Sequence, residues 1–177
     1  ILDLRDNPGG VLEAAVDVCG LFLDEGTVLT TKGRAFGQTQ SHKVSPWRLS
    51  RYRQPLVLLV NADTASASEI VAAALKDHKR ATLIGSRTFG KGLVQSVLPV
   101  ECGQSAVCVT TARLYAPGGE SSHGLGVSPD IAVEAQNARG PRPDPEHDPA
   151  LRRAVELLAN QTRRTVAAQS APAPVLA

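Results

Sequence analysis

The sequence predicts an α/β fold with at least some parallel strand pairing. Short apolar runs typical of strands alternate with segments of helical periodicity along most of the 177 residues. The run from Pro55 to Val60 is continuously apolar, which is typical of a strand buried on both faces. Aromatic residues make up only 3% of the sequence, so the core is expected to consist of Val, Leu, Ile and Ala.

The first half of the sequence is expected to contain three strands and two helices. The strands are expected at 1–5, 27–31 and 55–60, the helices at 11–23 and 65–79, and an exposed hairpin or loop at 34–44. The second helix is rich in Ala and ends in His78-Lys79-Arg80, and cations suit that end of a helix dipole. The run from Asp6 to Gly10 is a dense turn signal between the first strand and the first helix.

The second half is expected to add strands at 81–85, 93–100, 106–115 and 131–133, with a loop rich in Gly and Ser at 117–126. The expected core therefore covers residues 1–138. A Pro-rich linker at 139–149, a C-terminal helix within 150–164 and a disordered tail at 165–177 are expected to follow. The sequence opens in the middle of a strand pattern at Ile1, so the core is expected to be truncated at its N-terminal side.

Composition argues against several classes of protein. The net charge is only +2, and the one basic cluster, Arg48 to Arg53, is interpreted as a solvated loop, so no nucleic-acid partner is expected. No apolar run has the roughly 18 residues that a membrane helix needs. The three cysteines form no Cys-x-x-Cys pair and no His lies at metal spacing, so neither a metal site nor a cofactor is expected. Cys19 is expected in the core.

Ser66 is the first candidate for chemistry. It lies where a buried strand turns into a helix, at the carboxyl end of the strand, where α/β proteins place their sites. The start of the helix offers unpaired N–H groups, so a serine there can attack a carbonyl while the Ala67 N–H receives the oxyanion. The alternative is structural, because Ser66 and Glu69 also have the spacing of a capping box.

Two glycine-containing segments complete the set of candidates. Lys91 lies between Gly90 and Gly92 in an apolar neighbourhood, and a lysine confined in an apolar cleft becomes a base near neutral pH. A surface loop lysine and a weak phosphate-binding loop are the alternatives, although the Walker pattern is missing. The Gly9-Gly10 pair can aim a backbone N–H into a cleft, or it forms an ordinary strand-to-helix turn.

Taken together, these segments resemble the carboxy-terminal processing peptidases, also called tail-specific proteases. Five ordered blocks carry the resemblance, which covers roughly residues 1 to 160. The blocks are Leu4-Arg5-Asp6-Asn7-Pro8-Gly9-Gly10, Ala65-Ser66-Ala67-Ser68-Glu69-Ile70, Thr88-Phe89-Gly90-Lys91-Gly92-x-x-Gln95, Thr110-Thr111-Ala112-Arg113-x-Tyr115-x-Pro117 and Gly124-x-Gly126-Val127-x-Pro129-Asp130. Lys91 also lies at the family's distance from the serine, 25 positions after Ser66.

The resemblance implies a serine endopeptidase with a Ser-Lys dyad that cleaves proteins near their C-termini. By position, Ser66 is the nucleophile, Lys91 the general base, and Gln95 the residue that orients or supports the lysine. The Ala67 N–H and a glycine N–H from Gly9 or Gly10 form the implied oxyanion hole. The implied fold is a ClpP/crotonase-like core with a mixed sheet and flanking helices, and a PDZ domain is absent from this chain.

The resemblance further implies protein or peptide substrates and a bacterial location in the periplasm or cell envelope. Membrane-associated or adaptor proteins are compatible partners, and the oligomeric state stays open. In such a location Cys102 and Cys108 could form a disulfide. Without the tail-gripping region, residues 1–177 alone are expected to have little activity on protein substrates.

Three other interpretations remain open. A classical triad needs a histidine, and His42, His78, His123 and His147 are all expected to be exposed, with His123 the only serious candidate for a cleft role. The chain could also be a non-catalytic scaffold or ligand-binding relative, which would be expected to lose Ser66 or Lys91. A crotonase-type acyl-CoA enzyme shares the fold class but would not require this pair.

Overall fold

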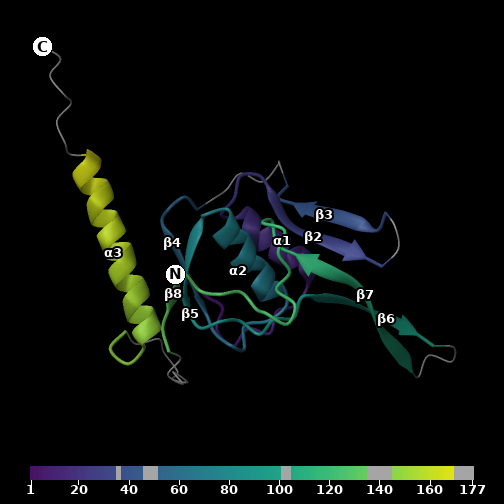
Figure 1. Cartoon of the computed structure of the whole chain (residues 1–177). Coiled ribbons are helices and arrows are strands. Elements are labelled where there is room, and N and C mark those ends of the chain that lie inside the picture. Colours follow the sequence, from purple (N-terminus) through teal and green to yellow (C-terminus); the bar gives the residue numbers. More distant parts are fainter. Residues whose placement is uncertain (35–36, 46–51, 101–104, 135–144, 170–177) are drawn as a thin grey trace, which may run out of the picture.

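A computed structural model describes residues 1–34, 37–45, 52–100, 105–134 and 145–169, with side chains described as far as Arg163. The chain forms two sheets and three helices in these segments (Figure 1). One sheet is parallel, in the order β1-β4-β5-β8, and consists of Leu2–Asp3, Leu56–Val60, Ala81–Gly85 and Ile131–Ala132. The other is antiparallel, in the order β3-β2-β7-β6, and consists of Thr39–Lys43, Thr27–Gly33, Ala106–Tyr115 and Leu93–Pro99.

The α/β fold class is therefore confirmed, and parallel and antiparallel pairing are divided between two sheets. Helices α1 (Leu12–Gly20) and α2 (Ala67–Asp77) share a hydrophobic core with one face of the parallel sheet and with β2. Helix α3 (Pro149–Gln169) packs on the opposite face of the parallel sheet. The parallel sheet is thus covered on both sides, which explains the continuous apolar run of β4.

The alternation of side chains along β4 shows how the two faces are used. Leu58 and Val60 belong to the core beneath α1 and α2, whereas Val57 and Leu59 belong to the core beneath α3. All four are fully buried. Burial of an aliphatic side chain contributes roughly 1.5–3 kcal/mol, so this strand is strongly held. The carboxyl end of β4, where the chain turns toward Ser66, therefore starts from a fixed position.

Element boundaries differ from the sequence expectation at both ends of the chain. β1 is limited to the two residues that pair with β4, although the Leu4 N–H still donates to the Leu59 carbonyl at 2.9 Å. α1 ends at Gly20 rather than at residue 23. α3 runs to Gln169, so the expectation of a disordered tail from residue 165 is wrong for 165–169. No Gly or Pro interrupts 150–169, and nothing in the sequence there stops a helix. Residues 170–177 lie outside the described residues.

Other expectations about the chain can be compared directly. The segment 34–44 contributes to a hairpin in which β3 pairs with β2. Cys19 is buried in the core, and burial raises the pKa of its thiol to about 12. Cys108 is exposed, but Cys102 lies outside the described residues, so their disulfide stays a prediction. The basic cluster at Arg48 to Arg53 falls mostly outside the described residues as well.

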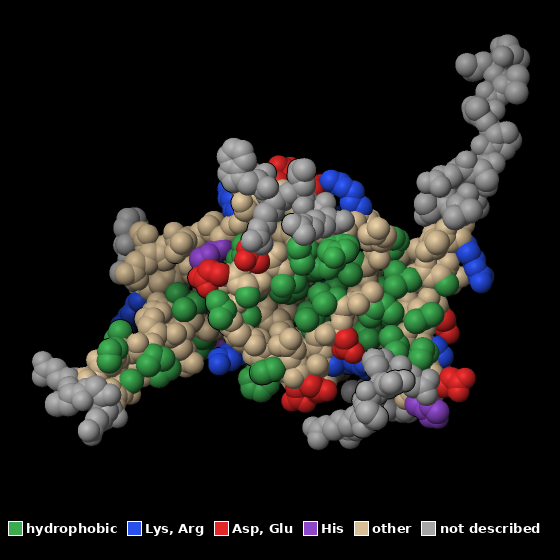
Figure 2. All heavy atoms as spheres, turned by 180° about the vertical axis from the view of Figure 1, so that it is seen from behind, with side chains coloured by type: hydrophobic (Ala, Val, Ile, Leu, Met, Phe, Trp, Pro, Cys, Tyr) green, Lys and Arg blue, Asp and Glu red, His purple; other side chains and the backbone are tan. Residues whose placement is uncertain are grey.

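The β6–β7 hairpin extends away from the rest of the molecule (Figure 1). Its exposed apolar residues include Val97, Leu98 and Val107, and hydrophobic side chains gather along the projecting arm in the space-filling view (Figure 2). Within the described segments, no helix is both long and apolar enough to cross a membrane. The same segments hold no group of three or more His, Cys, Asp or Glu placed to bind a metal ion.

Candidate active site

Ser66 lies at the start of α2 with an unusual backbone conformation. Its φ is 56° and its ψ is −119°, so it occupies the region of positive φ that non-glycine residues rarely adopt. An ordinary N-cap residue has an extended backbone and needs no such conformation. Holding a non-glycine residue there costs about 1–3 kcal/mol, and strain of this kind clusters at functional sites. The nucleophile of α/β-hydrolases sits on a comparably strained strand-to-helix turn.

The turn from Asp6 to Gly10 packs directly against Ser66. Gly9 has a φ of 92°, and a Cβ placed on it would lie 2.6 Å from both the Ala65 carbonyl oxygen and the Ala67 nitrogen. Only a glycine permits this approach. The Ala65 N–H donates to the Asn7 carbonyl at 3.0 Å. The Asp6–Gly10 turn therefore lies directly against Ser66.

A second set of contacts fixes the entrance to this turn. The Asp6 N–H donates to Asn61 Oδ1 at 3.0 Å, and Asn61 Nδ2 donates to Asp6 Oδ1 at 2.9 Å. The Thr64 hydroxyl, which is buried, donates to the Leu4 carbonyl at 2.8 Å. The Gly9 N–H donates to Asn7 Oδ1 at 2.9 Å. Because the Gly9 N–H is engaged in this way, Gly10 is the better candidate for a second oxyanion donor.

Glu69 joins the turn that carries Ser66 to the loop at 88–92, which contains Lys91 and is called the lysine loop below. Its side chain is buried, with 1% of the residue exposed. Oε2 accepts the N–H groups of Ser66 and Lys91, each at 2.8 Å. Oε1 accepts the Gly90 N–H at 2.7 Å and the Thr88 hydroxyl at 2.5 Å. One oxygen therefore bridges the backbones of the two residues predicted to form the dyad.

The Lys91 loop is held from its other side by the segment around His123. A Cβ on Gly90 would lie 2.9 Å from the Gly126 nitrogen, and a Cβ on Gly92 would lie 2.7 Å from the His123 nitrogen. The Gly90 carbonyl accepts the Gly124 N–H at 2.9 Å. The glycines on both sides of Lys91 thus serve close packing, as expected from the sequence. The N–H groups of Gly90 and Lys91 donate to Glu69, so they are not free to bind a phosphate.

The expected apolar cleft does not enclose Lys91 among the described residues. Lys91 is exposed, as is Gln95, which follows it on β6. Gln95 pairs with Thr110 of β7, next to a bulge between Val94 and Gln95. The local sequence around Lys91 is apolar, but Phe89 turns outward and is 66% exposed. The apolar residues next to Lys91 in the sequence therefore do not bury it.

The expected exposure of the histidines holds for His147 alone. His42, His78 and His123 are half-buried. His78 packs against Gly26, and its Nε2 lies 2.8 Å from the Thr27 carbonyl oxygen, which is a structural contact. The His123 Nδ1 is buried and has no hydrogen-bond partner among the described residues. His123 therefore stays the one histidine beside the candidate site.

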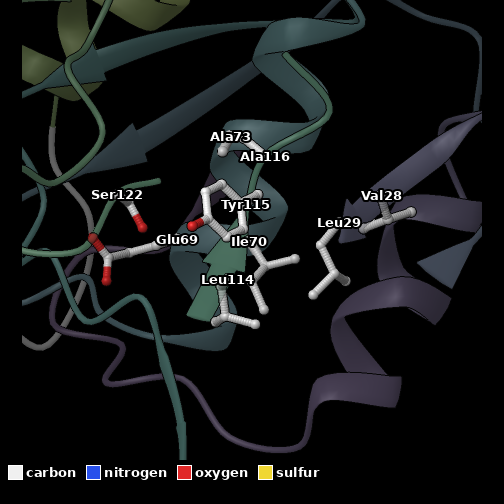
Figure 3. Close-up of a pocket in the computed structure, with 9 residues that line it drawn as sticks. All are labelled: Val28, Leu29, Glu69, Ile70, Ala73, Leu114, Tyr115, Ala116 and Ser122. Carbon is white, nitrogen blue, oxygen red and sulfur yellow. The ribbon is translucent and has the colours of Figure 1, made fainter. Parts of the chain in front are cut away.

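A small apolar pocket adjoins Glu69 on the side of α2 that faces the antiparallel sheet. Its walls include Leu29 of β2, Ile70 and Ala73 of α2, and Leu114 and Tyr115 of β7. Figure 3 shows these side chains around a common space, with Glu69 and Ser122 at one end. The Leu114 N–H donates to the Gly92 carbonyl at 2.9 Å, so the pocket is tied to the lysine loop as well.

Sequence reasoning assigned Glu69 only the part of a capping residue and did not single out Thr88. The predicted capping interaction of Glu69 is present, since the Ser66 N–H donates to the Glu69 carboxylate. The signal that pointed to Glu69 was its spacing from Ser66, and a local spacing says nothing about residues 88 to 91. Thr88 is buried, donates to Glu69 and accepts the Val127 N–H at 2.7 Å, so it links the site to the last sequence block.

The candidate site thus combines a strained serine at a helix N-terminus, a glycine turn against it and a lysine loop bound to the same carboxylate. The family model for peptidase family S41 matches residues 1–133. The chain belongs to this family.

Relatives of the family include a carboxy-terminal-processing protease of Bartonella bacilliformis, 45% identical over 135 residues, which covers 76% of this chain and 30% of that protein. A second is the chloroplastic carboxyl-terminal-processing peptidase 1 of Arabidopsis thaliana, 46% identical over 132 residues, or 74% of this chain and 26% of that protein. The solved photosystem II D1 C-terminal processing protease is 41% identical with a TM-score of 0.67, and the match covers 75% of this chain and 34% of that one. The chain thus spans about a third or less of the length of these relatives.

Replacing Gly9 by alanine should damage the site more than replacing Gly10. The new Cβ at position 9 would collide with backbone atoms on both sides of Ser66, whereas a Cβ on Gly10 would meet no atom within 4 Å. We expect Gly9→Ala to lower the free energy of unfolding by more than about 1 kcal/mol. The collision would push the turn, and with it the Gly10 N–H, away from Ser66. Reaction of Ser66 with a serine-directed fluorophosphonate should therefore slow by about 10², the usual cost of a lost oxyanion donor. Gly10→Ala is the matched control, because both variants keep their backbone N–H groups and only the Cβ at position 9 meets other atoms. Equal behaviour of the two variants would refute the contact.

Proposed function

We propose that this chain is the catalytic core of a serine endopeptidase that uses Ser66 as its nucleophile. The single observation that carries the proposal is the strained backbone of Ser66, held at the start of α2 by the carboxylate that also binds the Lys91 N–H. A capping role alone would not require that strain. The Ser66 hydroxyl attacks the scissile carbonyl carbon, the leaving amine departs, and water hydrolyses the resulting acyl-enzyme.

The family resemblance, together with the backbone contacts around Ser66, supports the other proposed roles. Lys91 accepts the serine proton in its neutral form and returns it to the leaving amine. The Ala67 N–H, which lies in the first turn of α2 and has no partner within the helix, stabilises the oxyanion together with a glycine N–H, Gly10 rather than Gly9. Gln95 supports the lysine. Because Lys91 is exposed, a bound substrate chain is required to exclude water from the amine.

The proposed substrates are proteins cleaved near their C-termini. The names of the relatives in Bartonella and Arabidopsis describe carboxy-terminal processing, which supports this class. The apolar pocket lined by Ile70, Ala73 and Leu114 adjoins Glu69, and its walls would favour a small apolar side chain near the scissile bond. Relatives occur both in bacteria and in chloroplasts, and for this chain we propose a bacterial location in the periplasm or cell envelope. Adaptor or membrane-associated partners belong to the same proposal.

One observation favours a second candidate, a non-catalytic relative with the same fold. Lys91 lies in the open rather than in the enclosed cleft expected for a catalytic lysine. A chain used as a scaffold would tolerate an exposed lysine at this position. Such a chain would not, however, require the strained backbone at Ser66.

The two candidates are separated by labelling the full-length protein that contains this chain with a fluorophosphonate. We expect the label on Ser66, located by peptide mass mapping, and no label in Ser66→Ala. Ser68→Ala, two positions further along α2, is the matched control and should keep the label. Circular dichroism should show an intact fold for Ser66→Ala, because a lost cap costs only about 1 kcal/mol. An unlabelled wild-type protein, or a label that survives Ser66→Ala, would favour the non-catalytic alternative.

A further inference from the structure

Asp148 is a buried carboxylate outside the part of the chain that the family model matches. The match ends at residue 133, and Asp148 directly precedes α3. Only 4% of the residue is exposed. Its Oδ1 accepts the Leu151 N–H at 3.0 Å, so it caps the helix. Its other oxygen, Oδ2, is not needed for the cap.

That second oxygen pairs with Arg5. The distance from Arg5 Nη1 to Asp148 Oδ2 is 2.7 Å, and the two side chains are 17% and 5% exposed. The other edge of the same guanidinium donates to Asp3, with Nε at 2.9 Å from Oδ1 and Nη2 at 2.6 Å from Oδ2. Hydrogen bonding to Asp3 and the nearby Asp148 carboxylate raise the pKa of Arg5. Arg5 is thus held between two carboxylates, one on its own segment and one on α3.

Arg5 is the last residue before the turn that faces Ser66. Its neighbour Leu4 is bound through its carbonyl to the Thr64 hydroxyl. Its other neighbour, Asp6, has a φ of 58° and is paired with Asn61. The Arg5 side chain therefore holds the one residue between these two anchored neighbours, directly where the chain enters the turn.

The body of α3 gives Asp148 a firm base for this contact. Ala150 and Ala154 pack against Val57, Leu59 and Ile84 of the parallel sheet. β4, which supplies Val57 and Leu59, is the strand that leads to Ser66. The carboxylate therefore reaches Arg5 from a helix anchored to the same strand as the nucleophile. In Figure 1, the start of α3 lies beside the parallel sheet, while its later turns project away.

We propose that Asp148 is a positioning residue for this site. Its carboxylate fixes the Arg5 guanidinium and, through Arg5, the Asp6–Gly10 turn that presents an oxyanion donor opposite Ser66. The inference deepens the proposed function and rests on it for the catalytic consequence, whereas the structural consequence for the turn stands without it. It gives the helix that follows the family core a part in the chemistry.

The test is Asp148→Asn in the full-length protein that contains this chain. Asparagine is as good an N-cap as aspartate, so the change removes the charge and keeps the helix start. We expect hydrogen exchange at residues 6–10 to become faster. The first-order rate of Ser66 acylation by a fluorophosphonate should fall about tenfold while the concentration for half-maximal rate stays unchanged, because the geometry rather than the binding is altered. Asp148→Glu keeps the charge and should restore part of the rate.

Asp24→Asn is the matched control, because Asp24 pairs with Arg53 on the surface, where the side chains are 46% and 72% exposed. It should change neither quantity. Unaltered exchange at residues 6–10 in Asp148→Asn would overturn the proposal, and so would equal losses in Asp148→Asn and Asp148→Glu. Failure of the wild-type protein to acylate would count against the proposed function alone, since the exchange measurement still decides whether Asp148 orders the turn.

Discussion

Replacing Lys91 by alanine in the full-length protein is expected to lower the rate of peptide cleavage by about 10² to 10⁴, the usual contribution of a general base. The expectation rests on the Glu69 oxygen that binds the N–H groups of both Ser66 and Lys91, since this bridge keeps the two backbones close. Lys91→Arg should not restore the rate, because a guanidinium stays charged.

Steady-state kinetics on one peptide substrate measures these effects, with Lys43→Ala as the control for loss of an exposed lysine. Chelators should leave the rate unchanged if no metal takes part. Near-normal turnover in Lys91→Ala would exclude the dyad. His123 would then become the leading alternative, because its Nδ1 is buried beside the lysine loop without a hydrogen-bond partner among the described residues.

The change of Glu69 to glutamine is expected to weaken stability and activity together. Glu69 accepts four hydrogen bonds in a buried position. In glutamine, one of the two accepting oxygens is replaced by an NH₂ group, which would face N–H and O–H donors and could accept none of their hydrogen bonds. Bonds to a charged acceptor are worth about 1.5–3 kcal/mol each and do not add, so we expect a loss of about 3 kcal/mol. For a chain of this size that corresponds to roughly 10 °C in Tm.

Activity in Glu69→Gln should fall by about 10², because a displacement of about 1 Å between reacting groups has this effect. The measurements are thermal unfolding and fluorophosphonate labelling of Ser66 in the full-length protein. Glu13→Gln, an exposed glutamate on α1, is the matched control and should leave both unchanged. A stable Glu69→Gln variant with normal labelling would show that the shared carboxylate does not hold the two loops in their working positions.

The sequence alone determined the elements and the identity of the candidate residues. Apolar periodicity located α2 and β4, because these segments are buried and their patterns report burial directly. Local turn chemistry predicted the Asp6–Gly10 turn, whereas its position opposite Ser66 was implied only by the family resemblance; the structure packs Gly9 against Ala65 and Ala67. The motif blocks indicated the family that the comparison confirmed over residues 1–133. Boundaries were less accurate, since α3 has no stop signal before residue 170 and its length depends on context.

The tertiary structure decided the contacts between segments. Capping spacing singled out Glu69, but only packing brought Thr88, Gly90 and Lys91 onto the same carboxylate. The apolar neighbours of Lys91 suggested burial, yet its side chain is exposed, because burial depends on what the fold places over a residue. Asp148 and Arg5 meet across almost the whole length of the chain. Periodicity and turn signals describe each segment by itself, whereas the pairing of buried polar groups is fixed only when the segments pack together.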